Sequence, residues 1–212
     1  MRRFWKPIVK FLAWVVGLLL VFVAVMRIFF VDAAVVGHNG MAPNLEVGDE
    51  ILLWRHGTPD TLGDITICPH PGRPNELVVG RVLAKGGMTI QTDPRGQLVV
   101  EGSVPDRNWV GEMRFTDVLE QRTEVMRRAI ENLGAVDYEI IQRQDAVFTV
   151  RPVAVPEGKI FLLGDNRTFV GQDSRYFGPV DPATCVGTVF MRLWPASESP
   201  NDLGHGFFDI ID

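Results

Sequence analysis

One uninterrupted apolar segment dominates the N-terminal part of the chain. Residues 11–26 (FLAWVVGLLLVFVAVM) carry no charge, and Lys10 and Arg27 flank them. With residues 28–31 added, about 20 residues are available, which is the length that a helix needs to cross the apolar core of a membrane. A helix without a polar face does not fit the surface of a globular domain. The pattern therefore predicts a transmembrane helix over residues 11–31.

Basic residues are concentrated on one side of this segment. Four of them lie within residues 1–10, one follows the segment, and no acidic residue occurs before Asp32. The positive-inside rule then places the N-terminus in the cytoplasm and the chain after about Asp32 outside. A cleaved secretory signal is the rival interpretation, but the apolar core is long and residues 31–33 (VDA) form a poor cleavage site. We expect an uncleaved anchor.

The chain after the anchor shows short apolar segments separated by turn residues. These segments are rich in β-branched residues, and Asp-Pro, Gly-Gly and Gly-Asp pairs punctuate them. They are too short for helices, so the pattern predicts a mainly β ectodomain. The segments are 51–54, 65–68, 77–79, 81–83, 98–100, 146–150, 159–163 and 186–194.

One stretch departs from the β pattern. Between residues 118 and 133 the apolar residues recur at helical spacing, with charged residues between them. Thr116 or Asp117 is a candidate N-cap, and Gly134 is a candidate end. The spacing predicts a helix over residues 117–133. Its apolar stripe either packs on the sheet or forms a docking face for a partner. The stripe includes Val118, Met126 and Ile130.

The charge is unevenly distributed. The chain has a net charge of −5, but five of its 21 basic residues belong to the N-terminal segment, which leaves 16 basic against 26 acidic residues. Binding to the phosphates of nucleic acid needs a positive field, so nucleic acid is excluded as the main partner.

The two cysteines and the four histidines form no metal-binding pattern. Cys68 and Cys185 lie in apolar, strand-like contexts outside the membrane, where a disulfide and two buried free thiols are both open possibilities. No two histidines are spaced for a metal, and we expect three of them to be surface residues. These three are His56, His70 and His205. We expect neither a metal nor a cofactor.

Several sequence blocks occur together in an order that is specific to one family. They are GMAPNLEVGDEILLWR (40–55), GDITIC (63–68), GRVLAKGG (80–87), VPEGKIFLLGDNR (155–167), DSRYFGPV (173–180) and VGTVFMRLWP (186–195). The chain resembles bacterial type I signal peptidase, the serine/lysine-dyad peptidase S26 family, over about residues 1–195.

This resemblance implies the domain organisation. The family has a coiled antiparallel β ectodomain with a small inserted subdomain. Here it implies a β core of residues 32–91 and 151–195, an inserted subdomain of residues 92–150 that contains the predicted helix, and a C-terminal tail of residues 196–212. It also places the anchor in the inner (cytoplasmic) membrane of a bacterium, with the ectodomain in the periplasm or an equivalent extracytoplasmic space.

The resemblance also identifies the positions of the reacting groups. Gly40 takes the place of the family's serine nucleophile, and Gly80 takes the place of the lysine base before Arg81. His38 stands where the family has a hydroxyl that helps to form the oxyanion hole, the other donor being the amide of residue 40. The serine that orients the lysine falls at residues 170–171, which are Val and Gly.

No other pair of residues is placed to restore a serine/lysine dyad. The first serine of the chain is Ser103, and the only lysines after the anchor are Lys85 and Lys159. A glycine offers neither a nucleophile nor a base. His38 has the chemistry of a base, but the sequence places no nucleophile beside it. The alternatives are a solvated histidine in a loop and a histidine that forms a hydrogen bond with the local backbone.

The supporting framework of the family is retained. Asp173 and Arg175 are two residues apart, so on an extended strand they would share a face and pair, and Arg81 has the chance to pair with an acid. Met41 and Pro43 match an apolar loop that inserts toward the membrane in the family. The matched framework residues are Met41, Pro43, Arg81, Gly164, Asp165, Asn166, Asp173, Ser174 and Arg175.

The two glycines lead us to expect a non-catalytic paralogue. Such a protein would be a binding or structural subunit of a membrane complex, in contact with the lipid bilayer, with another membrane protein and with segments that resemble signal peptides. An active type I signal peptidase with unorthodox residues is the alternative from the enzyme class. A membrane-anchored β module with an unrelated ligand is the third interpretation.

Overall fold

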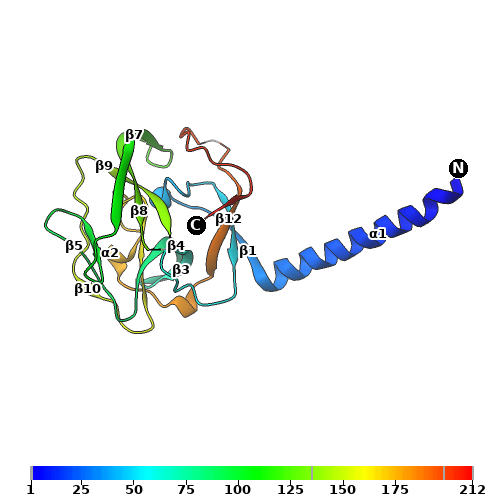
Figure 1. Cartoon of the computed structure of the whole chain (residues 1–212), viewed down its shortest axis with the longest axis horizontal. Helices are drawn as coiled ribbons and strands as arrows, with labels where there is room; N and C mark the ends of the chain where they lie inside the picture. Colours follow the sequence, from blue (N-terminus) through cyan, green and yellow to red (C-terminus); the bar gives the residue numbers. More distant parts are fainter. Residues whose placement is uncertain (1, 135, 198, 212) are drawn as a thin grey trace.

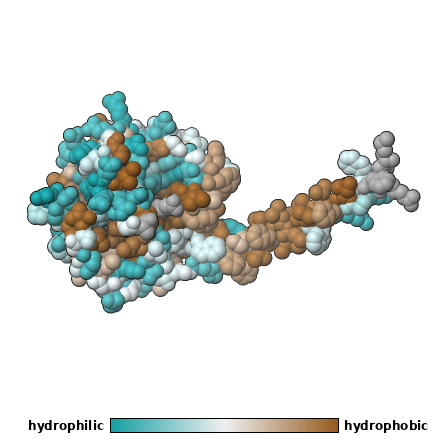
Figure 2. All heavy atoms as spheres, in the orientation of Figure 1, coloured by the Kyte–Doolittle hydropathy of each residue, from teal (hydrophilic) through white to brown (hydrophobic). Residues whose placement is uncertain are grey.

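An apolar helix projects from a β-rich ectodomain (Figure 1). In this computed structural model, helix α1 (Arg2–Val25) continues into a π-helical segment, η1 (Met26–Phe30). The most apolar 18-residue stretch within Trp5–Phe30 has a mean hydropathy of 2.7, and none of it is buried by the rest of the chain. Figure 2 shows apolar residues along this helix and a mixed surface on the ectodomain. By length and composition the helix can cross a membrane, as predicted. The structure describes residues 2–134, 136–197 and 199–211.

Polar side chains from the segment that follows strand β2 (Glu50–Trp54) contact the end of the anchor. Arg55 donates to the carbonyl of Ile28 at 3.2 Å, and the Nε2 atom of His56 lies 2.7 Å from the carbonyl oxygen of Phe29. These contacts satisfy carbonyl groups that the end of a helix leaves without partners. Asp32 adds an ion pair with Arg27 at 2.8 Å.

The main sheet is antiparallel and begins directly after the anchor. Its strand order is β1-β2-β12-β3-β4-β11, with β13 paired to β12, so β1 lies at one edge and β11 at the other. The strands are β1 (Val31–Val35), β2 (Glu50–Trp54), β3 (Ile65–His70), β4 (Arg73–Lys85), β11 (Ile160–Leu163), β12 (Gly187–Trp194) and β13 (Asp209–Ile210).

Two three-stranded sheets lie beyond β4. One has the order β10-β5-β6 and the other β7-β8-β9. Their strands are β5 (Thr89–Thr92), β6 (Leu98–Val100), β7 (Asp106–Asp117), β8 (Arg122–Asn132), β9 (Asp137–Arg143) and β10 (Val153–Ala154), and the short helices of the ectodomain are η2 (Asn39–Met41), α2 (Ser174–Phe177) and η3 (Pro182–Thr184). The prediction of a mainly β fold is confirmed.

The prediction of a helix over residues 117–133 is wrong. These residues form the turn and second strand of the β7–β8 hairpin. Asp117, a candidate helix cap in the sequence, accepts the backbone N–H groups of Leu119 and Glu120 in that turn instead. Cross-strand ion pairs stabilise the sheet, including Arg128 with Glu139 of β9. The spacing of apolar residues within one segment does not reveal which residues of other strands pair with it. Here the pairing with those strands decides the structure and overrides the helical spacing.

Residues 146–150 also differ from the prediction, because they form a loop and not a strand. Val147 is 88% exposed, whereas Phe148 and Val150 are buried. The loop therefore contributes side chains to the core without pairing its backbone in a ladder.

Two clusters of buried residues form most of the core. One joins β4 and β11 to the small sheets, and it includes Phe161, Ile90 and Ile140. The other lies under the loop between β1 and β2, and it includes Met41 and Leu45. The second cluster holds the segment that contains Gly40 against the main sheet.

Cys68 and Cys185 form a disulfide. The bond links β3 to the chain just before β12, across a sequence separation of 117 residues. This settles the choice that the sequence left open between a disulfide and two free thiols.

Candidate functional site

The site is built around a turn in the loop between β1 and β2. The turn η2 starts after His38, whose Nδ1 atom accepts the backbone N–H of Gly40 at 3.0 Å. The imidazole stacks on the ring of Phe169, with the ring centroids 5.4 Å apart. A Cβ atom on Gly40 would lie 2.9 Å from the imidazole and 3.2 Å from Phe169. The His38 ring therefore fills the space in which a side chain at position 40 would begin.

His38 is a neutral imidazole at physiological pH. Burial lowers its pKa, and the charges of Asp117 and Asp173 oppose this effect only in part. Because Nδ1 accepts a hydrogen bond, the proton of the neutral ring is on Nε2. Nε2 is buried and has no hydrogen-bond partner among the residues that the structure describes. The site thus contains one uncommitted donor.

Gly80 lies in β4, opposite Thr66 of β3. A Cβ atom at Gly80 would lie 2.9 Å from the Cβ atom of Leu162 in β11. Neighbouring Leu162 therefore leaves no room for a longer side chain here without a shift of β11. The Cα atoms of β4 and of η2 come within 8 Å of one another, so the two elements that carry the two glycines are neighbours.

A buried ion pair lies next to Gly80. Arg81 donates from Nε and Nη2 to the two carboxylate oxygens of Asp165 at 3.0 and 2.9 Å. The two side chains are 0% and 1% exposed. Asn44 donates a third hydrogen bond to Asp165 at 2.7 Å. The pair joins β4, the segment after β11 and the loop that follows Gly40.

The segment after β11 is attached directly to the turn at Gly40. The backbone N–H of Asn166 donates to the carbonyl of Gly40 at 3.0 Å, and its side chain donates to the carbonyl of Asn39 at 3.2 Å. A Cβ atom at Gly164 would lie 2.5 Å from the Gly40 carbonyl oxygen. Only glycine at position 164 permits this close approach.

Asp173 and Arg175 form an ion pair, but in a different geometry from the predicted one. They do not lie on an extended strand, since Asp173 is the N-cap of α2 and Arg175 lies in its first turn. Asp173 also accepts the backbone N–H of Gly164 at 3.2 Å, and Ser174 accepts that of Leu162 at 3.0 Å. These residues therefore hold β11 and the segment after it in position.

Met41 and Pro43 belong to the core of the ectodomain. Met41 is 0% exposed, and Pro43 is buried. The expectation of a loop that inserts into the membrane does not hold for these two side chains. The carbonyl of Pro43 lies 2.7 Å from Nε2 of His205 in the C-terminal tail. The side chain of His205 is 14% exposed, so this residue lies only partly at the surface.

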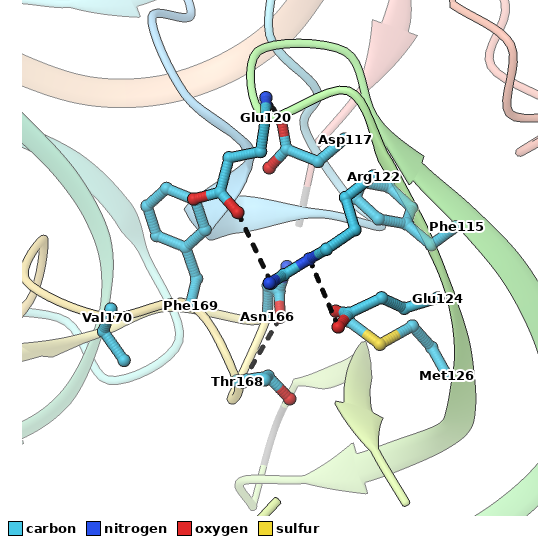
Figure 3. Close-up of a pocket in the computed structure, with 10 residues that line it drawn as sticks. All are labelled: Phe115, Asp117, Glu120, Arg122, Glu124, Met126, Asn166, Thr168, Phe169 and Val170. Carbon is cyan, nitrogen blue, oxygen red and sulfur yellow. Dashed lines mark hydrogen bonds and ion pairs between the residues drawn. The ribbon is translucent and has the colours of Figure 1, made fainter.

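A small pocket of about 90 Å³ adjoins the site, and Phe169 and Asn166 belong to its lining (Figure 3). In it Arg122 lies between two carboxylates, with ion pairs to Glu120 at 3.4 Å and to Glu124 at 3.3 Å. Val170, where the sequence placed the orienting position, lines this pocket. The pocket is lined by Phe115, Asp117, Glu120, Arg122, Glu124, Met126, Asn166, Thr168, Phe169 and Val170.

Sequence reasoning missed a second buried charge cluster. Arg167 and Arg107 both pair with Glu131, to which Tyr138 also donates a hydrogen bond. Burial opposes ionisation of Glu131, but the two guanidinium groups outweigh it and lower the pKa of this carboxyl. Arg107 and Glu131 are opposite each other in the hairpin register, so a correct prediction of the hairpin would have revealed the pair.

Comparison with known proteins gives a consistent result. A family model described as "Signal peptidase, peptidase S26" matches residues 8–194. A relative named Signal peptidase I from Streptococcus pneumoniae is 31% identical over 187 residues, which cover 84% of this chain and 89% of that protein. Signal peptidase I V of Bacillus subtilis is 28% identical and covers 89% of this chain and 96% of that protein. A solved signal peptidase I from Enterococcus faecalis covers 60% of this chain and 94% of that chain, at 24% identity and a TM-score of 0.33.

These relatives overturn one expectation from the sequence. We expected no enzyme, because of the glycines at positions 40 and 80. The relatives that match most of the chain carry the name of a peptidase, and nothing in the comparisons points to a non-catalytic subunit. The prediction of an inactive protein rested on two residues, Gly40 and Gly80, whereas the similarity to these peptidases extends over most of the chain. That prediction is therefore withdrawn.

Proposed function

Since the chain belongs to the signal peptidase family, peptidase S26, we propose that it is a membrane-anchored peptidase that cleaves the signal peptides of exported proteins. The observation that carries this proposal is the 31% identity to a protein named Signal peptidase I over 84% of the chain. The buried pairs Arg81–Asp165 and Arg175–Asp173, which tie β4, β11 and the loop at Gly40 together, support it.

The anchor and the charges around it define the proposed location. The basic residues before the anchor, among them Lys6 and Lys10, favour an N-terminus in the cytoplasm of a bacterium. The ectodomain then lies on the outer face of the inner membrane. A disulfide between Cys68 and Cys185 fits an oxidising compartment there. Its substrates arrive as membrane-spanning segments, next to the helix that anchors the enzyme.

The reacting group in this proposal is His38, because positions 40 and 80 carry no side chain. When the carbonyl oxygen of the scissile peptide bond accepts the backbone N–H of Gly40, it displaces Nδ1 of His38 from that N–H. The freed Nδ1 atom is then a base, and the Gly40 amide stabilises the developing oxyanion. The hydrogen bond of 3.0 Å between His38 Nδ1 and the Gly40 N–H thus positions the base next to the oxyanion donor.

Water is the nucleophile in this scheme. His38 Nδ1 accepts a proton from water as the water oxygen forms its bond to the carbonyl carbon. The C–N bond then breaks, and the proton passes from the imidazolium to the leaving amine. The small pocket beyond Phe169 is available for a side chain of the bound peptide.

The test compares two histidines that occupy the same kind of turn. His38 accepts the N–H of Gly40, and His70 accepts the N–H of Gly72, both from Nδ1 at 3.0 Å. Full-length protein in lipid nanodiscs is incubated with a purified preprotein, and the initial rate of cleavage is measured. His38→Asn keeps an acceptor for the N–H but removes the base. We expect it to lower the rate by at least about 100-fold.

The matched variant His70→Asn should leave the rate unchanged, because His70 is the last residue of β3 and its hydrogen bond to Gly72 is exposed. The rate of the wild type should also fall on acidification below pH 6.5, since the pKa of His38 is lowered and only the neutral ring accepts a proton. Cleavage that is equally fast in His38→Asn would contradict the role of His38. Absence of cleavage by the wild type would contradict the proposed function itself.

A further inference from the structure

A second pocket of about 530 Å³ lies between the β5–β6 loop and the β7-β8-β9 sheet. Three guanidinium groups line it, those of Arg95, Arg107 and Arg127, and no described residue of its lining carries a carboxylate. This is unusual for an ectodomain that contains more acidic than basic residues. The remaining lining residues include Trp109 and the amides of Gln97 and Gln142.

Arg107 is only partly neutralised. Its Nε atom donates to Glu131 at 2.7 Å, but the same carboxylate also pairs with Arg167. Glu131 is 1% exposed, so water does not screen its interaction with the two guanidinium groups. One negative charge is shared between two guanidinium groups, which leaves an excess of positive charge beside the pocket.

Arg127 is held in place by an aromatic ring and not by an acid. Its guanidinium carbon lies 3.9 Å from the ring centroid of Trp109, and that of Arg107 lies 5.6 Å from the same ring. Within the described part of the chain, neither the guanidinium of Arg127 nor that of Arg95 forms an ion pair with a carboxylate, and Asp93 accepts only the backbone N–H of Arg95 at 2.8 Å. Glu112 is opposite Arg127 in the strand register but forms no such pair. Stacking on the indole orders the guanidinium and leaves its N–H edges available.

We propose that this pocket binds the phosphoryl group of a soluble phosphorylated compound. Guanidinium groups present paired N–H donors that match the oxygens of a phosphate, and several of them around one cavity favour an anion with more than one charge. This binding is independent of peptide cleavage at Gly40 and His38.

The position of the pocket argues for a soluble compound and against a lipid headgroup. The anchor enters the main sheet at the edge strand β1, whereas the small sheets pack with β4 and β11 at the opposite edge of that sheet. Figure 1 shows β5 and β9 on the side of the ectodomain that faces away from α1. The headgroups around the anchor are therefore remote from the three arginines.

Isothermal titration of the full-length protein in detergent micelles with inorganic pyrophosphate tests the proposal. We expect a dissociation constant below about 1 mM at low salt, and we expect this constant to rise as salt is added. Arg127→Gln should weaken binding about tenfold, because it removes one charge-assisted donor group. The control Arg73→Gln removes an exposed guanidinium that lies on β4 and pairs with Glu76, outside the lining of the pocket, and it should leave binding unchanged.

Two results would overturn the proposal. The first is pyrophosphate binding that is absent at about 10 mM or is equal in the wild type and in Arg127→Gln. The second is copurified phosphatidylglycerol, detected by native mass spectrometry, that is lost in Arg127→Gln while pyrophosphate does not bind. That second result would assign the pocket to a lipid.

Discussion

At the residue scale, His38 and Gly40 are two parts of one packing arrangement. The imidazole occupies the space where a Cβ atom on residue 40 would lie, and it stacks on Phe169. It also accepts the backbone N–H of Gly40. A glycine at position 40 is therefore what allows a histidine at position 38 to pack against the turn. The same relation holds between Gly80 and Leu162 in the neighbouring strands.

This relation predicts a coupling between the two positions. Gly40→Ala should lower the free energy of unfolding by about 1–3 kcal/mol, because its methyl group meets the His38 ring at 2.9 Å. In a His38→Ala background the ring is absent, and the same change should cost much less. Urea unfolding of the four proteins of this double-mutant cycle measures the coupling. Equal costs in both backgrounds would show that the ring does not fill this space.

At the element scale, the β7–β8 hairpin shows where local sequence patterns fail. Met126 and Ile130 are four residues apart, a spacing that places them on one face of a helix and also on one face of a strand. The register with β9, and not the local spacing, decides between them, and it brings Arg128 to Glu139. The strands around β2, β4 and β12 were predictable, because turn residues delimit each apolar segment.

The site itself was predictable in part. The motifs identified Arg81, Asp165 and Asp173 as framework residues, and the structure places their charges in buried ion pairs. A hydrogen bond of His38 to the local backbone was one of the alternatives open from the sequence, and the bond to the Gly40 N–H is of that kind. The stacking of His38 on Phe169 was not predictable, because the two residues lie more than 100 positions apart along the chain.

The hairpin also yields a prediction about Met126. It is 2% exposed and packs with Ala42, Phe115 and Ile141, so the apolar stripe is core at this position and not a docking face. Met126→Glu should lower the free energy of unfolding by at least about 3 kcal/mol, because it buries an unpaired charge.

The adjacent residue provides a matched control for that experiment. Val125 is 47% exposed, so Val125→Glu should change the free energy of unfolding by less than about 1 kcal/mol. The free energy of unfolding of both variants is measured by unfolding the ectodomain in urea. Similar stabilities of the two variants would contradict the assignment of Met126 to the core.

At the scale of the whole molecule, the anchor and the ectodomain form one continuous arrangement. The helix ends at the edge strand of the main sheet, and Arg55 and His56 bind the carbonyl groups of its last turn. The site at Gly40 lies in the first loop after that edge strand. Under the proposed function, this arrangement brings the site close to chains that emerge from the same membrane.

The most direct test of the central claim is the identity of the bond that is cut. Full-length protein in nanodiscs is incubated with a preprotein, and the masses of the products are determined by mass spectrometry. The account predicts a single new N-terminus at the end of the signal peptide, formed by the wild type and lost in His38→Asn. An intact preprotein after prolonged incubation, or cuts scattered through its mature part, would contradict it.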